Sequence, residues 1–217
     1  MNDAILNILP FIVAAIATLF SLTIHEFCHG FAAYLQGDMT ARDHGRLTLN
    51  PIAHIDPIGT LLIPGILLLT HSPFMIGWAK PVPFNPYNLR TGRWGALLVA
   101  LAGPFSNLVL FFISLLLLKF LNLPPTNFLP IFLMYLAVVN FVLGLFNLLP
   151  IPPLDGSKIL LAILPSKYDH IIEVLEVYGP YILIGILVFE YTTKPFIGPG
   201  ILYLLRSISS WVGVPLL

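Results

Sequence analysis

The chain has 217 residues, of which 58% are hydrophobic and 9% are charged, and its mean hydropathy is +0.93. Soluble domains carry roughly 25% charged residues, so this composition excludes an ordinary soluble protein and indicates an integral membrane protein. Ten basic and ten acidic residues leave a formal net charge of zero, which excludes the basic surface of a nucleic-acid-binding protein.

The first apolar segment, residues 5–36, would measure about 48 Å as a helix, against about 30 Å for the hydrocarbon core of a bilayer. No basic n-region precedes it, so we expect a retained transmembrane helix rather than a signal peptide. Residues 25–29 read HEFCH, a match to H-E-x-x-H that is expected by chance about 0.003 times in a chain of this composition. The motif lies about 13 Å of helical rise before Asp38, so we expect it below the membrane surface.

The HEFCH motif predicts a metal site with hydrolytic chemistry. His25 and His29 are four residues apart, so on a helix they share one face and can bind one zinc ion. Glu26 would take a proton from zinc-bound water, whose pKa the metal lowers to about 7. The alternative is a pair of hydrogen-bonded histidines that pack inside a bundle. Cys28, the single cysteine, is expected to pack as a small hydrophobe.

Three shorter segments follow before the next long apolar run. Residues 45–51 and 77–85 carry β-formers bounded by Gly, Asn and Pro, which predicts a small membrane-associated β hairpin or sheet. Its edge would either bind a substrate as an added strand or only close the bundle. Residues 58–70 are apolar but too few to cross a bilayer, so a re-entrant or buried segment is predicted.

Two long apolar runs occupy the middle of the chain. Residues 93–121 and 127–149 are each long enough to cross a bilayer, and a turn at residues 122–125 would join them as an antiparallel pair. Residues 166–177 mix charged and apolar side chains in a pattern that predicts an amphipathic surface helix.

The C-terminal part predicts a kinked span near residues 179–190 and a last crossing within residues 197–217. The fold class is therefore an all-α polytopic membrane protein with about four to six transmembrane helices. We expect a single domain over residues 1–217, with its core at residues 4–163 and C-terminal helices at residues 166–217.

Basic residues predict the orientation of these spans. Lys119 falls on one side, and six others fall on the opposite side, which marks that side as cytoplasmic: Arg42, Arg46, Arg90, Arg93, Lys158 and Lys167. The HEFCH end of the first helix would then face the cytoplasmic half of the bilayer. No organelle-targeting peptide is evident, so we expect a prokaryotic inner (plasma) membrane.

A second informative stretch is NLLPIPPLDG, residues 147–156. Its three prolines force extended backbone, which membrane depth tolerates only where it is buried in protein or lines a wet cavity. Hydrolytic zinc sites usually have three protein ligands plus water, so two histidines leave one place to fill. Asp155, at the end of this stretch, is the best-placed carboxylate for it. The alternative for Asp155 is an ordinary helix N-cap.

Together these motifs resemble the site-2 protease family of intramembrane zinc metalloproteases. The resemblance is carried by residues 25–29 and 147–156, and also by residues 45–51, 54–60, 77–83 and 102–107. It implies one zinc ion per chain, bound by His25, His29 and Asp155, with Glu26 activating the water. It also implies cleavage of membrane-embedded substrate helices, typically after a site-1-type protease has trimmed them. No room remains for a PDZ or CBS domain, so a minimal form is expected.

Three further polar residues, His54, Asn107 and Asn147, are candidates to orient the substrate or to stabilise the oxyanion that develops on the scissile carbonyl. Each could equally serve as a helix-packing hydrogen bonder. The expected partners are a transmembrane protein substrate and the lipid bilayer, with no nucleic acid, and the sequence does not define the oligomeric state.

Two other function classes stay open at this point. A ZIP-like membrane metal transporter also carries an H-E-x-x-H-like element in a membrane helix. Against it, the apolar runs at residues 93–121 and 127–149 contain no histidine or acidic residue that would form a second metal-binding helix. A non-catalytic membrane scaffold is the third class, and it would hold no tightly bound metal.

Overall fold

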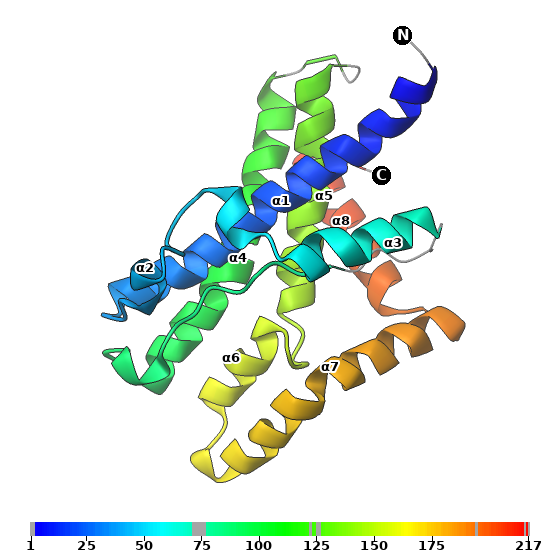
Figure 1. The fold of residues 1–217 in the computed structure, drawn as a ribbon. Coiled ribbons are helices and arrows are strands. Elements are labelled where there is room, and N and C mark those ends of the chain that lie inside the picture. Colours follow the sequence, from blue (N-terminus) through cyan, green and yellow to red (C-terminus); the bar gives the residue numbers. More distant parts are fainter. Residues whose placement is uncertain are drawn as a thin grey trace. The chain divides into compact units, whose positions relative to one another are not determined.

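The computed structural model describes residues 3–70, 77–121, 123–124, 127–193, 195–214 and 216. Figure 1 shows its helices coloured along the sequence, and the chain divides into two compact units. Met1–Ser21 and Pro104–Leu217 form the first, which we call the bundle unit, and Leu22–Gly103 form the second, the motif unit. Two long helices, α1 (Asp3–Leu35) and α4 (Arg93–Leu121), each contribute residues to both units.

Among the described residues, three helices are long and apolar enough to cross a membrane: α1, α4 and α5 (Phe128–Asn147). The bounds of α4 agree with the predicted run at residues 93–121. A further pair, Val177–Thr192 and Ile197–Val212, passes the same test together but is bent by 79°. The described residues thus support a membrane protein with three spans, one fewer than the predicted minimum, or with four if the bent pair is one span, which is the lower end of the predicted range.

The C-terminal helices differ from their predicted boundaries. After α6 (Asp155–Ile163) and the short η4 (Ser166–Tyr168), α7 runs without a break from Asp169 to Thr192. The predicted surface helix and the predicted kinked span are therefore one helix that contains Pro180. Gly179 packs against the loop between α5 and α6, residues 148–154. An added Cβ at Gly179 would lie 2.6 Å from the carbonyl oxygen of Pro152. The last helix, α8 (Ile197–Val212), ends before Gly213, and the predicted turn at 122–125 lies partly outside the described residues.

The core of the bundle unit lies between α4, α5 and α8. Its buried apolar side chains are Phe111, Leu115, Ala137, Phe141, Leu205 and Leu216. The rings of Phe111 and Phe141 are 4.7 Å apart, within the range of favourable aromatic contacts. These contacts hold the two central spans side by side, as the antiparallel pair in Figure 1 shows.

A polar network crosses the same unit. Asn140 of α5 donates to Ser21 Oγ of α1 (2.8 Å) and to the carbonyl of Leu136 (2.8 Å), and it accepts a bond from Asn107 of α4 (2.7 Å). Ser21 in turn donates to the carbonyl of Ala17 (2.7 Å). Such bonds join membrane helices because lipid offers no competing partner.

The motif unit contains short helical turns where the sequence predicted strands. No strand occurs among the described residues, so the predicted hairpin over residues 45–51 and 77–85 is not confirmed. Three turns begin instead at an Asn-Pro or Asp-Pro pair: η1 (Pro51–His54), η2 (Pro57–Leu62) and η3 (Pro86–Asn88). In each, the Asn or Asp side chain accepts a backbone N–H two residues on, and proline takes the first helical position.

The apolar segment at 58–70 is helical and too short to span. It comprises η2 and α3 (Ile63–Leu69), and its large side chains are mostly exposed, Leu69 by 81%. The segment is therefore not buried within the motif unit, and a re-entrant position stays a prediction.

Asp38 fastens the loop after α1 and is fully buried. Its Oδ1 accepts bonds from Thr40 N (3.1 Å), Thr40 Oγ1 (2.5 Å) and Asn88 Nδ2 (3.0 Å), and its Oδ2 accepts one from Asn85 N (2.7 Å). Burial alone would raise the pKa of this carboxyl, but the hydrogen bonds outweigh it and hold the pKa below its usual 3.8. The ionised carboxylate therefore joins the end of α1 to η3.

We expect Asp38→Asn to lower the free energy of unfolding by about 1–3 kcal/mol at pH 7, because an amide NH₂ would face backbone donors. A lowered folded pKa contributes stability above pH 3.8 that is lost as the pH falls through the folded value. The difference from wild type in thermal unfolding should therefore shrink below about pH 4. Asp43→Asn, at an exposed carboxylate nearby, is the control. An Asp38→Asn deficit that is the same at pH 7 and pH 3 would contradict this role.

Candidate metal centre

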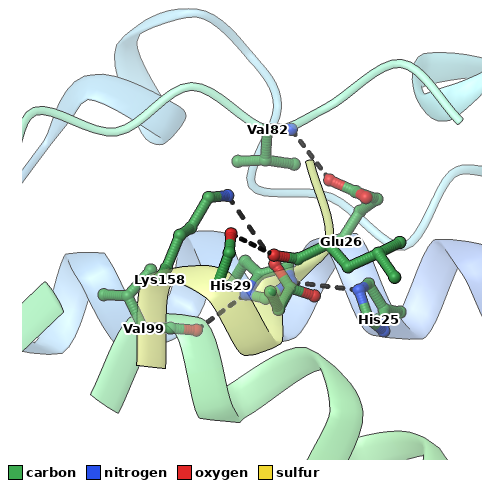
Figure 2. Close-up of polar contacts among 9 residues, drawn as sticks. His25, Glu26, His29, Val82, Val99 and Lys158 are labelled. Carbon is green, nitrogen blue, oxygen red and sulfur yellow. Dashed lines mark hydrogen bonds and ion pairs between the residues drawn. The ribbon is translucent and has the colours of Figure 1, made fainter. Parts of the chain in front are cut away.

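His25 and His29 lie one turn apart on α1, and their rings meet edge to face with centroids 4.6 Å apart. Their Nε2 atoms are 3.0 Å apart (Figure 2). Two zinc–nitrogen bonds at a tetrahedral angle would place the nitrogens about 3.3 Å apart. The pair is therefore already close to the geometry of two ligands on one ion.

A backbone carbonyl on α4 sets the orientation of one of these rings. His29 Nδ1 lies 2.7 Å from the carbonyl oxygen of Val99. Because a carbonyl oxygen only accepts, Nδ1 carries the proton, and the lone pair of the neutral ring lies on Nε2. This is the tautomer that a metal ligand needs.

Gly103 of α4 lies against both imidazoles. An added Cβ there would be 2.3 Å from His29 Nε2 and 2.7 Å from His25 Nε2. The point beside both nitrogens is therefore open only because residue 103 lacks a side chain. The donor set and this cradle fit a metal ion at the two Nε2 atoms.

Glu26 extends from the same helix toward the loop at residues 77–85. Its Oε2 accepts a hydrogen bond of 2.8 Å from the backbone N–H of Val82 (Figure 2). Glu26 thus has a fixed orientation within the motif unit. Cys28 is half-buried.

Asp155 belongs to the bundle unit, where it is the first residue of α6 and only 6% exposed. Its Oδ1 lies 3.6 Å from Lys158 Nζ. The N-cap of α6 is Leu154, with no side-chain cap bond, so Asp155 is not the N-cap that the alternative interpretation required. Gly156 allows the tight turn before it, since an added Cβ would lie 2.3 Å from the carbonyl oxygens of Leu148 and Leu149.

The three further candidates all bond within their own units. His54 is buried in the motif unit, and its Nε2 donates to the carbonyl of Thr48 (2.8 Å). Asn107 belongs to the network around Asn140, and Asn147 donates to the carbonyl of Leu143 (3.0 Å). Their roles toward a substrate stay predictions.

Three contributors to the site were not singled out from the sequence: Val99, Val82 and Gly103. Val99 and Val82 act through backbone atoms, so their side chains carry no signal. Gly103 lies in the sequence AGPFSN at residues 102–107, but its importance is the absence of a side chain.

Comparison with known proteins indicates a peptidase. The model of peptidase family M50 matches residues 123–187. YwhC of Bacillus subtilis, named as a zinc metalloprotease, is 38% identical over 205 residues, which cover 90% of this chain and 89% of the relative. Rip2 of Mycolicibacterium smegmatis, also so named, is 30% identical over 82% of this chain and 67% of its own length. No solved structure matches the chain.

We expect Gly103→Ala to weaken zinc binding by at least about tenfold, because the new methyl group would compete with the ion beside both Nε2 atoms. Bound zinc is measured by elemental analysis of purified protein equilibrated with buffered zinc. Gly65→Ala on α3 is the matched control, since an added Cβ there meets no atom within 4 Å. Full zinc occupancy in Gly103→Ala at the wild-type affinity would show that the ion lies elsewhere.

Proposed function

Because this chain belongs to the zinc metalloproteases of peptidase family M50, we propose that it hydrolyses peptide bonds within or near the transmembrane segments of membrane proteins. Family membership establishes the metalloprotease activity and the zinc cofactor, in agreement with the resemblance to site-2 proteases. The intramembrane location of the cleavage is the proposed step. One observation carries it: the histidine pair lies on a helix that is itself a candidate span.

The depth of the histidines supports this location. The apolar stretch of α1 runs over Leu9–Leu35, and His29 precedes its end by about 9 Å of helical rise. His25 is only 4% exposed. Ionisable groups at such a depth are costly and usually mark a functional site.

We assign Asp155 as the third zinc ligand beside His25 and His29. Two histidines leave a hydrolytic site one protein ligand short. Asp155 is a buried carboxylate at the start of α6, and carboxylate oxygens are among the usual ligands of zinc. When bound, the zinc ion acts as a Lewis acid and lowers the pKa of a water molecule.

We assign Glu26 as the general base. The Val82 N–H engages its Oε2, and a carboxylate offers a second oxygen that can take up a proton. Glu26 would pass this proton to the leaving amine as the peptide bond breaks. The neutral His29 ring, oriented by Val99, would keep its place throughout.

The remaining elements of the proposal concern the cellular context. The substrate is a transmembrane protein, delivered through the lipid bilayer and trimmed beforehand by a site-1-type protease. Basic residues that flank the spans favour an inner membrane with the site toward the cytoplasmic half. The ZIP-like transporter is not favoured, because the relatives are named as metalloproteases and α4 and α5 contain no histidine or carboxylate.

Glu26→Gln should retain about one zinc ion per chain while cleavage falls by at least about a thousandfold, because an amide cannot act as general base. Zinc is measured by elemental analysis. Turnover is measured on transmembrane peptides that the inactive variant traps and mass spectrometry identifies. Undiminished cleavage by Glu26→Gln would remove the assigned mechanism.

Asp155→Ala should lower both bound zinc and turnover, and excess zinc should restore part of the occupancy. Lys158→Ala is the matched control, because it removes the neighbouring cation and leaves the carboxylate. If Asp155→Ala keeps full zinc and full turnover, another residue supplies the third ligand. Zinc flux into liposomes that responds to these changes would instead favour a transporter.

A further inference from the structure

Residues 78–83 form an irregular, extended segment in the motif unit whose amides are used at every second residue. The bonds run from Trp78 N to Gly59 O (3.1 Å), from Lys80 N to His54 O (2.9 Å) and from Val82 N to Glu26 Oε2 (2.8 Å). One side of the segment is thus bonded to η2, η1 and α1 in turn, and its last bond is to the proposed base.

The opposite side of the segment is poor in donors. Pro81 and Pro83 have no N–H, which leaves at most the amide of Ala79 for an incoming chain. An added β-strand needs donors and acceptors in alternation along an edge. The segment is therefore better suited to holding Glu26 than to pairing with a substrate strand.

Gly30 lets the segment approach the helix. It lies one turn after Glu26 on the same face of α1, and an added Cβ would be 2.9 Å from Val82 Cγ1 and 3.2 Å from Ala41 Cβ. The Val82 side chain is packed there with only 7% exposure. A larger residue at position 30 would push the Val82 amide away from Glu26.

Arg46 donates hydrogen bonds to the carbonyl groups that precede the Val82 amide. Its Nη2 donates to the carbonyl of Lys80 (2.6 Å) and, at 3.4 Å, to the carbonyl of Pro81, whose peptide nitrogen is the Val82 N–H. Arg46 is 8% exposed, and its Nε is buried without a partner among the described residues. Burying this cation is costly, and its contacts are with this segment.

We propose that residues 80–82 act as a peptide clamp that fixes the Glu26 carboxylate in the orientation needed for proton transfer, with Gly30 and Arg46 as positioning residues. The cationic Arg46 and the anionic Glu26 lie at opposite ends of the Pro81–Val82 peptide, and each strengthens the other's hydrogen bond to it. The clamp rests on the proposed function, because its purpose is to orient the base.

The decisive comparison is Val82→Pro against Val82→Ala. Proline removes the N–H at a position already flanked by prolines, whereas alanine removes side-chain packing and keeps the amide. On a fluorogenic transmembrane peptide with a Gly-Pro pair inside about 20 apolar residues, kcat of Val82→Pro should be at least about tenfold below that of Val82→Ala. KM and bound zinc should agree within about twofold. Equal kcat values for the two variants would overturn the clamp.

A second measurement needs no turnover. In protein labelled with ¹⁵N-valine, Glu26→Gln should move the Val82 amide proton upfield, because a charge-assisted bond becomes a neutral one. Arg46→Ala should move the same resonance and lower kcat, and Arg46→Lys should restore part of both, since Lys keeps a donor for the carbonyls. An unmoved resonance in Glu26→Gln would refute the contact.

The two experiments separate the clamp from the function on which it rests. If wild type does not cleave the peptide or any trapped substrate, the proposed function fails, and the amide resonance still decides whether the contact exists. If wild type cleaves and the Pro and Ala variants agree, the function stands and the clamp fails. A general loss of folding would lower bound zinc and the unfolding temperature together with kcat, which distinguishes it from lost positioning.

Discussion

Polar side chains on an apolar helix need hydrogen-bond partners within the protein, since lipid supplies none and an unpaired buried polar group is costly. Three of the partners described above for α1 are backbone groups. The Val99 carbonyl holds His29, the Val82 amide holds Glu26, and the Ala17 carbonyl takes the Ser21 hydroxyl. Beyond the helix, backbone and side-chain donors surround Asp38. The motif unit folds around α1 in a way that meets this requirement, and the ligand geometry follows from it.

Much of the fold could be predicted from hydrophobic length alone, because α1, α4 and α5 need only enough apolar residues to cross a bilayer. The hairpin expected from Gly, Asn and Pro boundaries is not confirmed among the described residues. Asn50, Asp56 and Asn85 each precede a proline, and a side chain that caps its own turn competes with strand pairing. Local capping by these side chains favours the three helical turns over strands. The Asn-Pro and Asp-Pro pairs are visible in the sequence and could have been used to predict the turns. Pro180 lies inside α7, which continues past it to Thr192.

The parts of the candidate site that consist of side chains could be predicted from the sequence. The parts that consist of backbone groups could not. The four-residue spacing of His25 and His29 is visible in any sequence, and helix geometry converts it directly into a shared face. The roles of Val99 and Val82 depend on which carbonyl or amide reaches α1, which only folding defines. Gly103 and Gly30 contribute because they lack a Cβ, which would clash with the groups packed against them. The third ligand, Asp155, stays a prediction from motif and burial.

The hydrogen bond between Asn140 and Ser21 restricts the rotation of α1 about its own axis. Ser21, His25 and His29 follow one another at intervals of four, so they form a single stripe along the helix. Asn140 donates its two amide hydrogens to Ser21 Oγ and to the carbonyl of Leu136, and its amide oxygen accepts a bond from Asn107. The helix therefore cannot turn about its axis without breaking a bond that lipid does not replace. A residue inserted between Ser21 and His25 would move the histidines about 100° around α1, out of line with Ser21, so the length of that interval carries as much information as the residues at its ends.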